Sequence, residues 1–302
     1  MSSRTAEIRV PPECRQMIRA GALVSVSHSG GKDSQAMTIL LSRIVLRAQL
    51  VAVHAPLGEV EWEGVVPHIE ATLPAGVPLI MAPVSSGKTL LDRVEERGKF
   101  PGIRQRYCTG DFKRTPIERE LRRYLKANPR FGGRLINCLG IRRDESAARA
   151  RRVPWRRNER LSVAGREVFD WLPIFDLSTE DVFRVIRDAG QSPHWIYRHL
   201  SRCSCSFCIF SSPEDLRRAA ELRPELYRRY AEIERRIGHT LSPSGIPLPE
   251  LTGISPSGSA DGAGAMALGS PRSRPAAARR PFARRSGLKP PCPESGAAQG
   301  SG

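Results

Sequence analysis

The chain has 302 residues, with 48 Lys and Arg against 31 Asp and Glu and a formal net charge of +17. This length suffices for one large domain or two ordinary ones, and no apolar run approaches the roughly 20 residues of a membrane span. The first residues, MSSRTAEIRVPPE, lack the apolar core of a secretory signal, so we expect a cytoplasmic protein with no membrane partner.

The basic excess is not confined to one end of the chain. Residues 1–250 hold 41 Lys and Arg against 29 Asp and Glu, and residues 251–302 hold seven against two. A basic body suits polyanionic partners such as nucleotides or nucleic acid. An arginine-rich proteome would give the same excess on solvated helix faces, and composition does not decide between these two explanations.

After a lead-in over residues 1–20, which holds a short helix at 12–20, the chain alternates strands and helices. Apolar, β-prone runs predict strands, and apolar positions at helical spacing predict helices. The strands are expected at 22–26, 50–54, 78–82 and 134–140, and the helices at 35–41, 61–73, 90–97 and 115–126. Strand, helix and strand within about 35 residues form a βαβ unit, so we expect a parallel sheet.

The second half of the chain is less regular. Residues 156–166 are polar and predict an irregular segment or a hairpin, and residues 169–175 form an apolar patch. Ser178 and Asp181 predict the start of a helix that ends near Ala189, and two further helices are expected at 213–222 and 224–237. Residues 251–302 are rich in Gly, Pro, Ser, Ala and Arg without periodicity, which predicts a disordered basic tail.

The most informative stretch joins the first strand to the first helix of the sheet. Its turn holds the string SGGKDS at 29–34, preceded by Ser27 and His28. Glycines let successive backbone N–H groups converge, and a helix N-terminus adds partial positive charge, so this geometry binds anions. Lys32 would add a point charge for a phosphate or sulfate. The spacing is neither that of a Walker A loop nor that of a dinucleotide fingerprint.

Four motifs in order carry a family resemblance. They are SGGKDS at 29–34, RYCT at 106–109 with Lys113 and Pro116, GIRRDESAAR at 140–149, and Pro173-Ile174 with Ser178, Asp181 and Val182. With them, residues 21–240 resemble the phosphoadenosine-phosphosulfate (PAPS) reductase family of the PP-loop ATP-pyrophosphatase superfamily. Ser178 falls near the position where that family usually carries Trp.

The resemblance implies a Rossmann-like α/β fold, with helices on both faces of a parallel sheet and a helical C-terminal part. It also implies an adenine nucleotide, either ATP or a sulfonucleotide such as PAPS or adenylyl sulfate. Family members either reduce a sulfonucleotide to sulfite or activate a substrate with ATP and release pyrophosphate. The implied partners are a thioredoxin-like reductant, or a cysteine-desulfurase sulfur donor, and nucleic acid as an acceptor.

One departure from the family bears on the chemistry. Sulfonucleotide reductases carry a C-terminal E-C-G-x-H thiol, and the late cysteine of this chain, Cys292, lies in PPCPE instead. The nucleophile of a true reductase is therefore missing or replaced. This favours the ATP-activating version, while the family name favours the reductase.

Cysteine spacing predicts a metal site. Cys203, Cys205 and Cys208 lie within six residues, and Cys108 is a fourth candidate ligand. All-cysteine sets of four bind tetrahedral zinc or a [4Fe–4S] cluster, and the resemblance favours iron–sulfur. A second role for Cys108 is a reactive thiol, with its pKa lowered by nearby basic residues. Cys14 and Cys138 are expected to be structural.

The remaining site predictions concern phosphate and magnesium. Arg142 and Arg149 are candidate clamps for phosphate or sulfate, because guanidinium groups bind such anions bidentately, and Glu145 is expected to orient one of them. Asp33 is a candidate Mg²⁺ ligand if ATP is the substrate, or a helix cap. The predicted catalytic residues are Lys32, Asp33, Arg142 and Arg149, and the predicted nucleotide-binding residues are Ser27, Ser29, Gly30, Gly31, Lys32, Asp33, Ser34, Gly140 and Arg142.

A hypothesis from a different class stays open. The C-x-C-x-x-C spacing and the basic tail also suit a non-catalytic nucleic-acid-binding module with a structural zinc. A bound zinc without nucleotide affinity would support it. The phosphate loop argues against it.

Overall fold

The computed structural model describes residues 7–256, and within them one sheet has the strand order β3-β2-β1-β4-β6-β5. The first five of these strands are mutually parallel, and β5 is antiparallel at the edge. The bounds are β1 Leu23–Ser27, β2 Leu50–His54, β3 Leu79–Met81, β4 Arg134–Cys138, β5 Trp155–Arg157 and β6 Glu167–Trp171. The predicted Rossmann-like α/β fold, with a largely parallel sheet, is confirmed.

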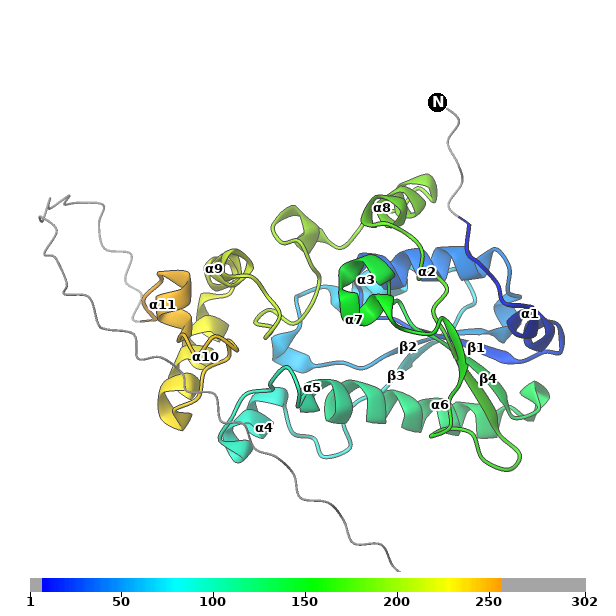
Figure 1. Ribbon diagram of the computed structural model, residues 1–302, viewed down its shortest axis with the longest axis horizontal. Helices are drawn as coiled ribbons and strands as arrows, with labels where there is room; N and C mark the ends of the chain where they lie inside the picture. Colours follow the sequence, from blue (N-terminus) through cyan, green and yellow to red (C-terminus); the bar gives the residue numbers. More distant parts are fainter. Residues whose placement is uncertain (1–6, 257–302) are drawn as a thin grey trace, which may run out of the picture. The chain divides into compact units, whose positions relative to one another are not determined.

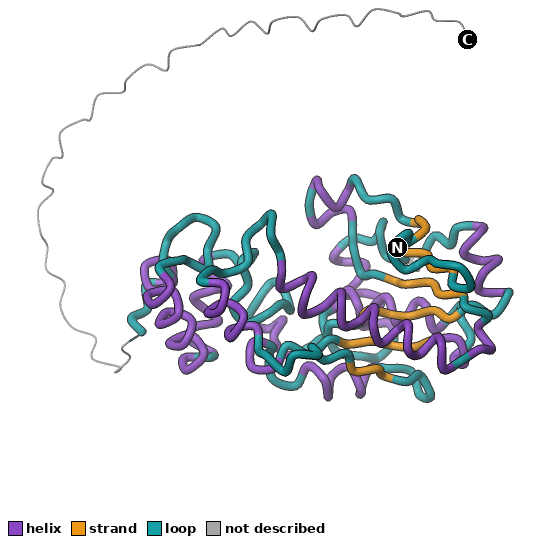
Figure 2. The backbone as a smooth tube through the Cα atoms, turned by 90° about the horizontal axis from the view of Figure 1, so that it is seen from below, coloured by secondary structure: helices purple, strands orange, loops and turns teal. Residues whose placement is uncertain are grey.

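Side chains on β1 alternate between two apolar cores, one on each face of the sheet. Val24 and Val26 pack with α1 (Pro12–Arg19), α2 (Lys32–Ser42) and α8 (Thr179–Asp188). Leu23 points to the other face, where α6 (Thr115–Ala127) packs on it. Figures 1 and 2 show these helices on opposite sides of the strands. Period-two alternation on a strand buried on both sides explains why β1 reads as a continuous apolar run.

A third apolar core joins helices from both halves of the chain. It joins α3 (Val65–Thr72) and α4 (Leu90–Arg97) to α9 (Pro213–Leu222), α10 (Pro224–Ile237) and α11 (Leu248–Thr252). Glu234, 5% exposed, ties this part together, because its carboxylate accepts the backbone N–H groups of Leu241 and Leu248, each at 2.7 Å. The predicted helical C-terminal part is therefore present.

Several predicted boundaries need correction. Helix α2 starts at Lys32 rather than Gln35, so the end of the phosphate loop is already helical. Helix α3 starts at Val65 rather than Glu61, after the left-handed Gly64. The apolar patch at 169–175 contains most of strand β6, which pairs with β5 at the start of the segment predicted to be irregular or a hairpin.

Two further differences concern segments that the sequence left without a helix. The polar connection before α6 is helical in α5 (Tyr107–Thr109) and in a π-turn, η3 (Gly110–Arg114). Helix α11 extends through Thr252, into the predicted tail. The rest of the predicted disordered tail, from residue 257, and the first residues of the lead-in lie outside the described residues.

A close approach of two loops gives a test of the fold. Gly133 has φ +69°, and a Cβ there would lie 2.1 Å from the carbonyl oxygen of Gly165. We expect Gly133→Ala to lower the free energy of unfolding by about 2–5 kcal/mol, because it adds a backbone clash to the cost of the left-handed conformation. Gly165→Ala is the matched control. Its φ is +75° with open space around it, so only about 1–2 kcal/mol is expected in urea unfolding. Equal losses in the two variants would contradict the packing.

Candidate functional site

The loop between β1 and α2 runs at the carboxyl ends of the parallel strands, the edge where open α/β sheets bind ligands. Gly30 has φ +74°, and a Cβ there would lie 2.9 Å from Cγ1 of Val65 at the start of α3. Gly31 caps α2 in an extended conformation. Both glycines are therefore required, one by its backbone conformation and the other by the residues that approach it.

Backbone N–H groups of the loop are held in place by side chains. The Ser29 N–H donates to Ser34 Oγ at 3.2 Å, and the Gly30 N–H donates to His28 Nδ1 at 3.1 Å. His28 is 3% exposed, and burial lowers its pKa to about 3. It is therefore a neutral ring whose Nδ1 accepts a hydrogen bond. Residues Ser29 to Ser34 thus form one ordered turn, in which the N–H groups of Ser29, Gly30 and Lys32 are engaged by side chains of the protein. The predicted anion binding by this turn stays a prediction.

Lys32 is the buried cation of the loop. It is 6% exposed, and its Nζ lies 3.0 Å from Oδ2 of Asp33. The ammonium also lies 6.0 Å from the ring centre of Phe183 and 5.5 Å from that of Tyr197. A cation held between a carboxylate and two ring faces is oriented before any ligand arrives.

Arg142 is placed beside the loop, but its guanidinium is already engaged. It is 2% exposed, Nε donates to Oδ1 of Asp33 at 2.7 Å, and Nη1 donates to both carboxylate oxygens of Asp144, at 2.8 and 2.7 Å. Nη1 and Nη2 also donate to the Leu177 carbonyl and to Thr179 Oγ1. The guanidinium thus links the start of α2 to the loop after β4 and to the start of α8, which is a positioning role. Its predicted role as a phosphate clamp stays a prediction.

Arg149 and Gly140 occupy the same loop region. Arg149, on the short helix α7 (Ala147–Ala150), pairs with Glu145, which fits the orienting role predicted for that carboxylate. A Cβ on Gly140 would lie 3.5 Å from the backbone of Asp33 and Ser34. The first and third motifs of the sequence therefore meet at the start of α2.

The cysteine segment also reaches the phosphate loop. A Cβ on Gly31 would lie 3.6 Å from Cβ and from the carbonyl oxygen of Cys203. The Ser206 N–H donates to the Val60 carbonyl at 2.9 Å, and Arg223 donates to Ser206 Oγ at 3.0 Å. The segment is thus fixed between the end of β2 and the start of α10, beside the loop.

The four predicted ligand thiols are neighbours in space. Ionisation of Cys108 or Cys208 would raise the pKa of Cys205, and ionisation of Cys205 would raise the pKa of Cys203. The Lys113 charge lowers the pKa of Cys108, Cys203 and Cys205. Burial raises the pKa of Cys203 to about 12 and that of Cys205 to about 11. Without a cationic partner stronger than Lys113, these thiols stay protonated at neutral pH.

One sequence prediction about Cys108 is wrong. Basic neighbours were expected to lower its pKa and make it a reactive thiol. Burial raises the pKa of Cys108 instead, and the opposing effect of the Lys113 charge is smaller. Arg106 stacks at 5.7 Å on the ring of Phe210, and Arg104 is exposed to solvent. Desolvation therefore outweighs the positive charge near this thiol.

Four thiols from two segments suit a thiolate-bound metal by their chemistry. In the described part of the chain, however, no three His, Cys, Asp or Glu side chains are close enough together to hold a metal ion. Metal binding therefore remains a proposal, with Cys108, Cys203, Cys205 and Cys208 as its ligands. The two cysteines expected to be structural, Cys14 and Cys138, are fully buried in the sheet core.

Sequence reasoning missed three residues of this site. Tyr197 accepts the Lys32 N–H at 2.9 Å, His54 lies with Nε2 3.4 Å from the Glu61 carboxylate, and Glu61 acts electrostatically on the thiols. His54 is the last residue of β2, so its place at the carboxyl edge was a usable signal. Tyr197 lies outside every motif, so the sequence contains no signal for its role.

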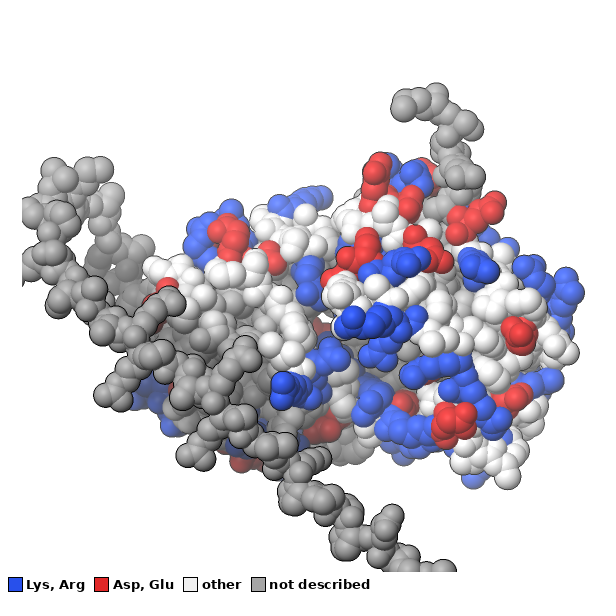
Figure 3. Space-filling model, viewed as in Figure 1, with Lys and Arg blue, Asp and Glu red and all other residues white. Residues whose placement is uncertain are grey.

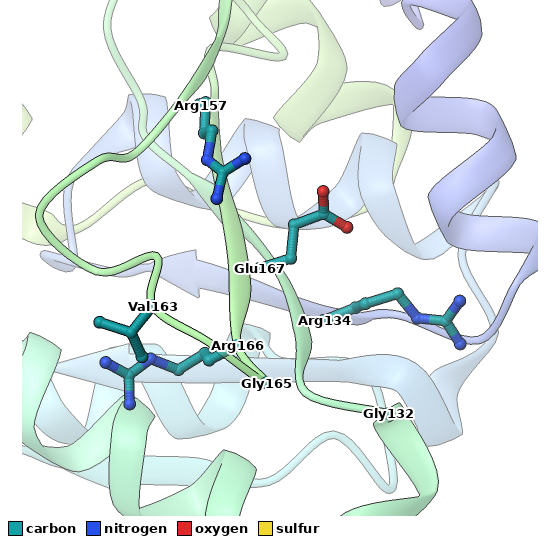
Figure 4. A pocket seen from close by; sticks show the side chains of 7 residues that line it. All are labelled: Gly132, Arg134, Arg157, Val163, Gly165, Arg166 and Glu167. Carbon is teal, nitrogen blue, oxygen red and sulfur yellow. The ribbon is translucent and has the colours of Figure 1, made fainter.

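A cavity lies at the opposite edge of the sheet from the loop. Its volume is about 340 Å³, and its lining residues are Gly132, Arg134, Arg157, Val163, Gly165, Arg166 and Glu167. Arg134 and Glu167 begin β4 and β6, which puts this cavity at the amino ends of the strands. Its arginine side chains diverge rather than surround one point (Figure 4), so we assign it no ligand.

Fold and site together define an α/β protein of the Rossmann-like type with a glycine-rich loop at the carboxyl edge of its sheet. The model of the phosphoadenosine phosphosulfate reductase domain matches residues 23–208. The chain belongs to this PAPS reductase domain family. The match contains the loop, the Arg142 region and all four candidate ligand cysteines.

Curated relatives share the sequence only in part. An uncharacterized 37.8 kDa protein of Escherichia phage 186 is 29% identical over 151 residues, which are 50% of this chain and 43% of that protein. An uncharacterized protein of Methanocaldococcus jannaschii is 22% identical over 226 residues, 72% of this chain and 48% of that protein. The chain thus spans less than half the length of both relatives.

The solved structures to which the chain is similar are more distant in sequence. The PAPS reductase of Candida auris in a phosphate complex has a TM-score of 0.41 and 12% identity, covering 64% of this chain and 94% of that one. The FMN adenylyltransferase of Candida glabrata has a TM-score of 0.39 and 12% identity, covering 64% of this chain and 57% of that one.

Among residues 7–256, no helix is long and apolar enough to cross a membrane.

Proposed function

We propose that this chain is an enzyme that binds an adenine nucleotide on the SGGKDS loop and performs sulfur chemistry at the adjoining cysteine segment. The observation that carries the proposal is the contact of Gly31 with Cys203, since a Cβ on this glycine would lie 3.6 Å from that residue. A phosphate-binding loop directly beside a cysteine segment suits a reaction in which sulfur attacks a group that the nucleotide has activated.

The ATP-activating version is the one we favour. An oxygen of the acceptor attacks the α-phosphorus of ATP, pyrophosphate leaves, and a sulfur nucleophile then displaces AMP from the adenylated acceptor. The loop N–H groups and Lys32 would bind the phosphates and neutralise the pyrophosphate. Because both carboxylate oxygens of Asp33 are engaged by Lys32 and Arg142, a Mg²⁺ ion at Asp33 would have to replace one of these contacts. The E-C-G-x-H motif that carries the terminal thiol of a reductase is absent from this sequence. Cys292 lies in PPCPE instead, outside the described residues.

The proposed metal would be held by Cys108, Cys203, Cys205 and Cys208, either as a [4Fe–4S] cluster or as zinc. An iron–sulfur cluster would supply electrons or hold sulfur, and zinc would activate a thiolate. What the chain itself contributes is a set of half-buried thiols near Lys113, three of them in a segment anchored by Arg223.

Nucleic acid is the acceptor class we propose. Basic side chains gather on the face shown in Figure 3. Arg151 and Arg152 follow α7 directly, and both are exposed. Within the described residues neither makes an ion pair, whereas Arg143, Arg156 and Arg160 are paired with carboxylates. Exposed arginines without a carboxylate partner suit the phosphate backbone of a polyanionic acceptor.

A product assay on anaerobically purified protein tests the function. The protein is incubated separately with ATP–Mg²⁺, adenylyl sulfate and PAPS, with a dithiol and single-stranded or duplex DNA or RNA, and products are separated by chromatography. AMP and pyrophosphate from ATP are the expected result. Sulfite from a sulfonucleotide would show that the chain is a reductase with a substitute nucleophile. Binding of zinc without turnover or nucleotide affinity would support the non-catalytic nucleic-acid-binding module instead.

Metal binding has a separate test. We expect Cys205→Ser to lose most of the iron or zinc that the wild-type protein holds when both are purified anaerobically, because a four-thiolate site loses one ligand. Cys138→Ser is the matched control, since its thiol is fully buried in the sheet core away from the segment, and it should keep the wild-type content. The measurement is metal analysis by mass spectrometry with an absorption spectrum. A wild-type protein without metal would refute the site.

A further inference from the structure

Tyr197 is the residue that joins the phosphate loop to the cysteine segment. It lies in a short 3₁₀ turn, η6 (Trp195–Arg198), which His194 caps by accepting the Ile196 N–H on Nδ1 at 3.3 Å. The ring of Phe183 on α8 meets the Tyr197 ring edge-on, with centres 5.6 Å apart and planes at 88°. The tyrosine is therefore held from its backbone and from its ring, and its hydroxyl has a defined direction.

The hydroxyl lies at the start of α2. It accepts the N–H of Lys32, the first helical residue, with 2.9 Å between nitrogen and oxygen. A Cβ on Gly31 would lie only 3.2 Å from this oxygen, so glycine is needed there for the tyrosine to reach the helix. The first N–H groups of a helix are the donors that an anion takes. A nucleotide phosphate that bound the Lys32 N–H would therefore compete with the Tyr197 hydroxyl.

The same side chain faces the cysteine segment. A Cβ on Gly31 would lie 3.2 Å from the Tyr197 hydroxyl oxygen and 3.6 Å from Cβ of Cys203, so the tyrosine and the cysteine segment approach each other at this glycine. Burial raises the pKa of Tyr197, so the hydroxyl stays neutral and accepts the Lys32 N–H. Only five residues separate Tyr197 from Cys203. A displacement of the tyrosine would be transmitted to the segment through this contact and through the backbone.

We propose that Tyr197 is a positioning residue that couples the two halves of the site: the nucleotide phosphate displaces its hydroxyl from the Lys32 N–H, and residues 195–208 shift with it. The inference rests on the proposed nucleotide site. It adds that nucleotide binding rearranges the cysteine segment, and that a change in the segment alters nucleotide affinity in return, since coupling between two sites is reciprocal.

Tyr197→Phe separates this role from direct contact with the nucleotide. The variant keeps the ring that packs on Phe183 and removes the competing oxygen. Tyr124→Phe on α6 is the matched control, because Tyr124 lies in the opposite core, with no contact to the loop. Calorimetric titration with ATP is expected to give about two- to tenfold tighter binding for Tyr197→Phe and no change for Tyr124→Phe, since one hydrogen bond no longer opposes binding.

Hydrogen–deuterium exchange measures the coupling itself and does not depend on turnover. In the wild-type protein, ATP should slow exchange in residues 28–34 and change exchange in residues 195–208. In Tyr197→Phe, ATP should still protect residues 28–34 while the response of 195–208 falls to half or less. Weaker binding by Tyr197→Phe, or an unchanged response of 195–208, would overturn the inference and leave the nucleotide site intact. A wild-type protein that binds no adenine nucleotide would overturn the proposed function and the inference with it.

Discussion

Lys32→Met is expected to weaken ATP binding about 10- to 150-fold, because it removes the cation that meets the phosphates while keeping a side chain of similar length. Lys32 is 6% exposed and held between Asp33 and two aromatic rings, so its charge is fixed at the loop and poorly screened by solvent. The dissociation constant is measured by calorimetry at one fixed salt concentration.

The matched control for this variant is Lys126→Met. Lys126 is exposed near the end of α6, far from the loop in sequence and on the helix that leads to the amino end of β4. We expect its removal to leave ATP affinity within about twofold, as a screened surface charge should. Equal affinity of the wild-type protein and Lys32→Met would contradict the assignment of the loop.

Arg142→Met is expected to lower the free energy of unfolding by about 3–5 kcal/mol, the usual cost of removing one partner from a buried ion pair. The change leaves Asp33 with Lys32 as its only ion-pair partner within the described residues, and it frees the Leu177 carbonyl and Thr179. Urea unfolding followed by circular dichroism measures the change.

Arg143→Met is the control for this stability test. The neighbouring Arg143 is exposed and pairs with Asp176 at 3.1 Å on the surface, so about 0–1 kcal/mol is expected. Equal stability of the two variants would show that the Arg142 contacts contribute nothing. A loss of nucleotide affinity without loss of stability in Arg142→Met would instead favour the clamp role that the sequence predicts.

Much of the sheet could be predicted because its strands are local signals. The runs that became β1, β2 and β4 are apolar and lie between turns, and βαβ spacing predicts that they are parallel. Strand β6 was missed as a strand because Pro173 and Ile174 extend its apolar run beyond Trp171, where pairing with β4 and β5 ends. Pairing partners, not the run itself, determine that boundary.

The site shows the same division between local and long-range information. The loop residues 29–34 could be predicted as one turn because strand, glycines and helix start are adjacent in sequence. The raised pKa of Cys108 could not be read from Arg104 and Arg106, since burial depends on residues distant in the chain. Tyr197 was missed for that reason too, as 165 positions separate it from the N–H that it accepts.

The central claim is that the SGGKDS loop holds nucleotide phosphates next to the cysteine segment. A crystal structure of the protein with a non-hydrolysable ATP analogue tests it most directly. Phosphate oxygens are expected within hydrogen-bond distance of the backbone N–H groups of Gly31 and Lys32 and of Lys32 Nζ, with the Tyr197 hydroxyl displaced. A nucleotide bound elsewhere, such as in the arginine-lined cavity at the opposite edge of the sheet, would contradict it.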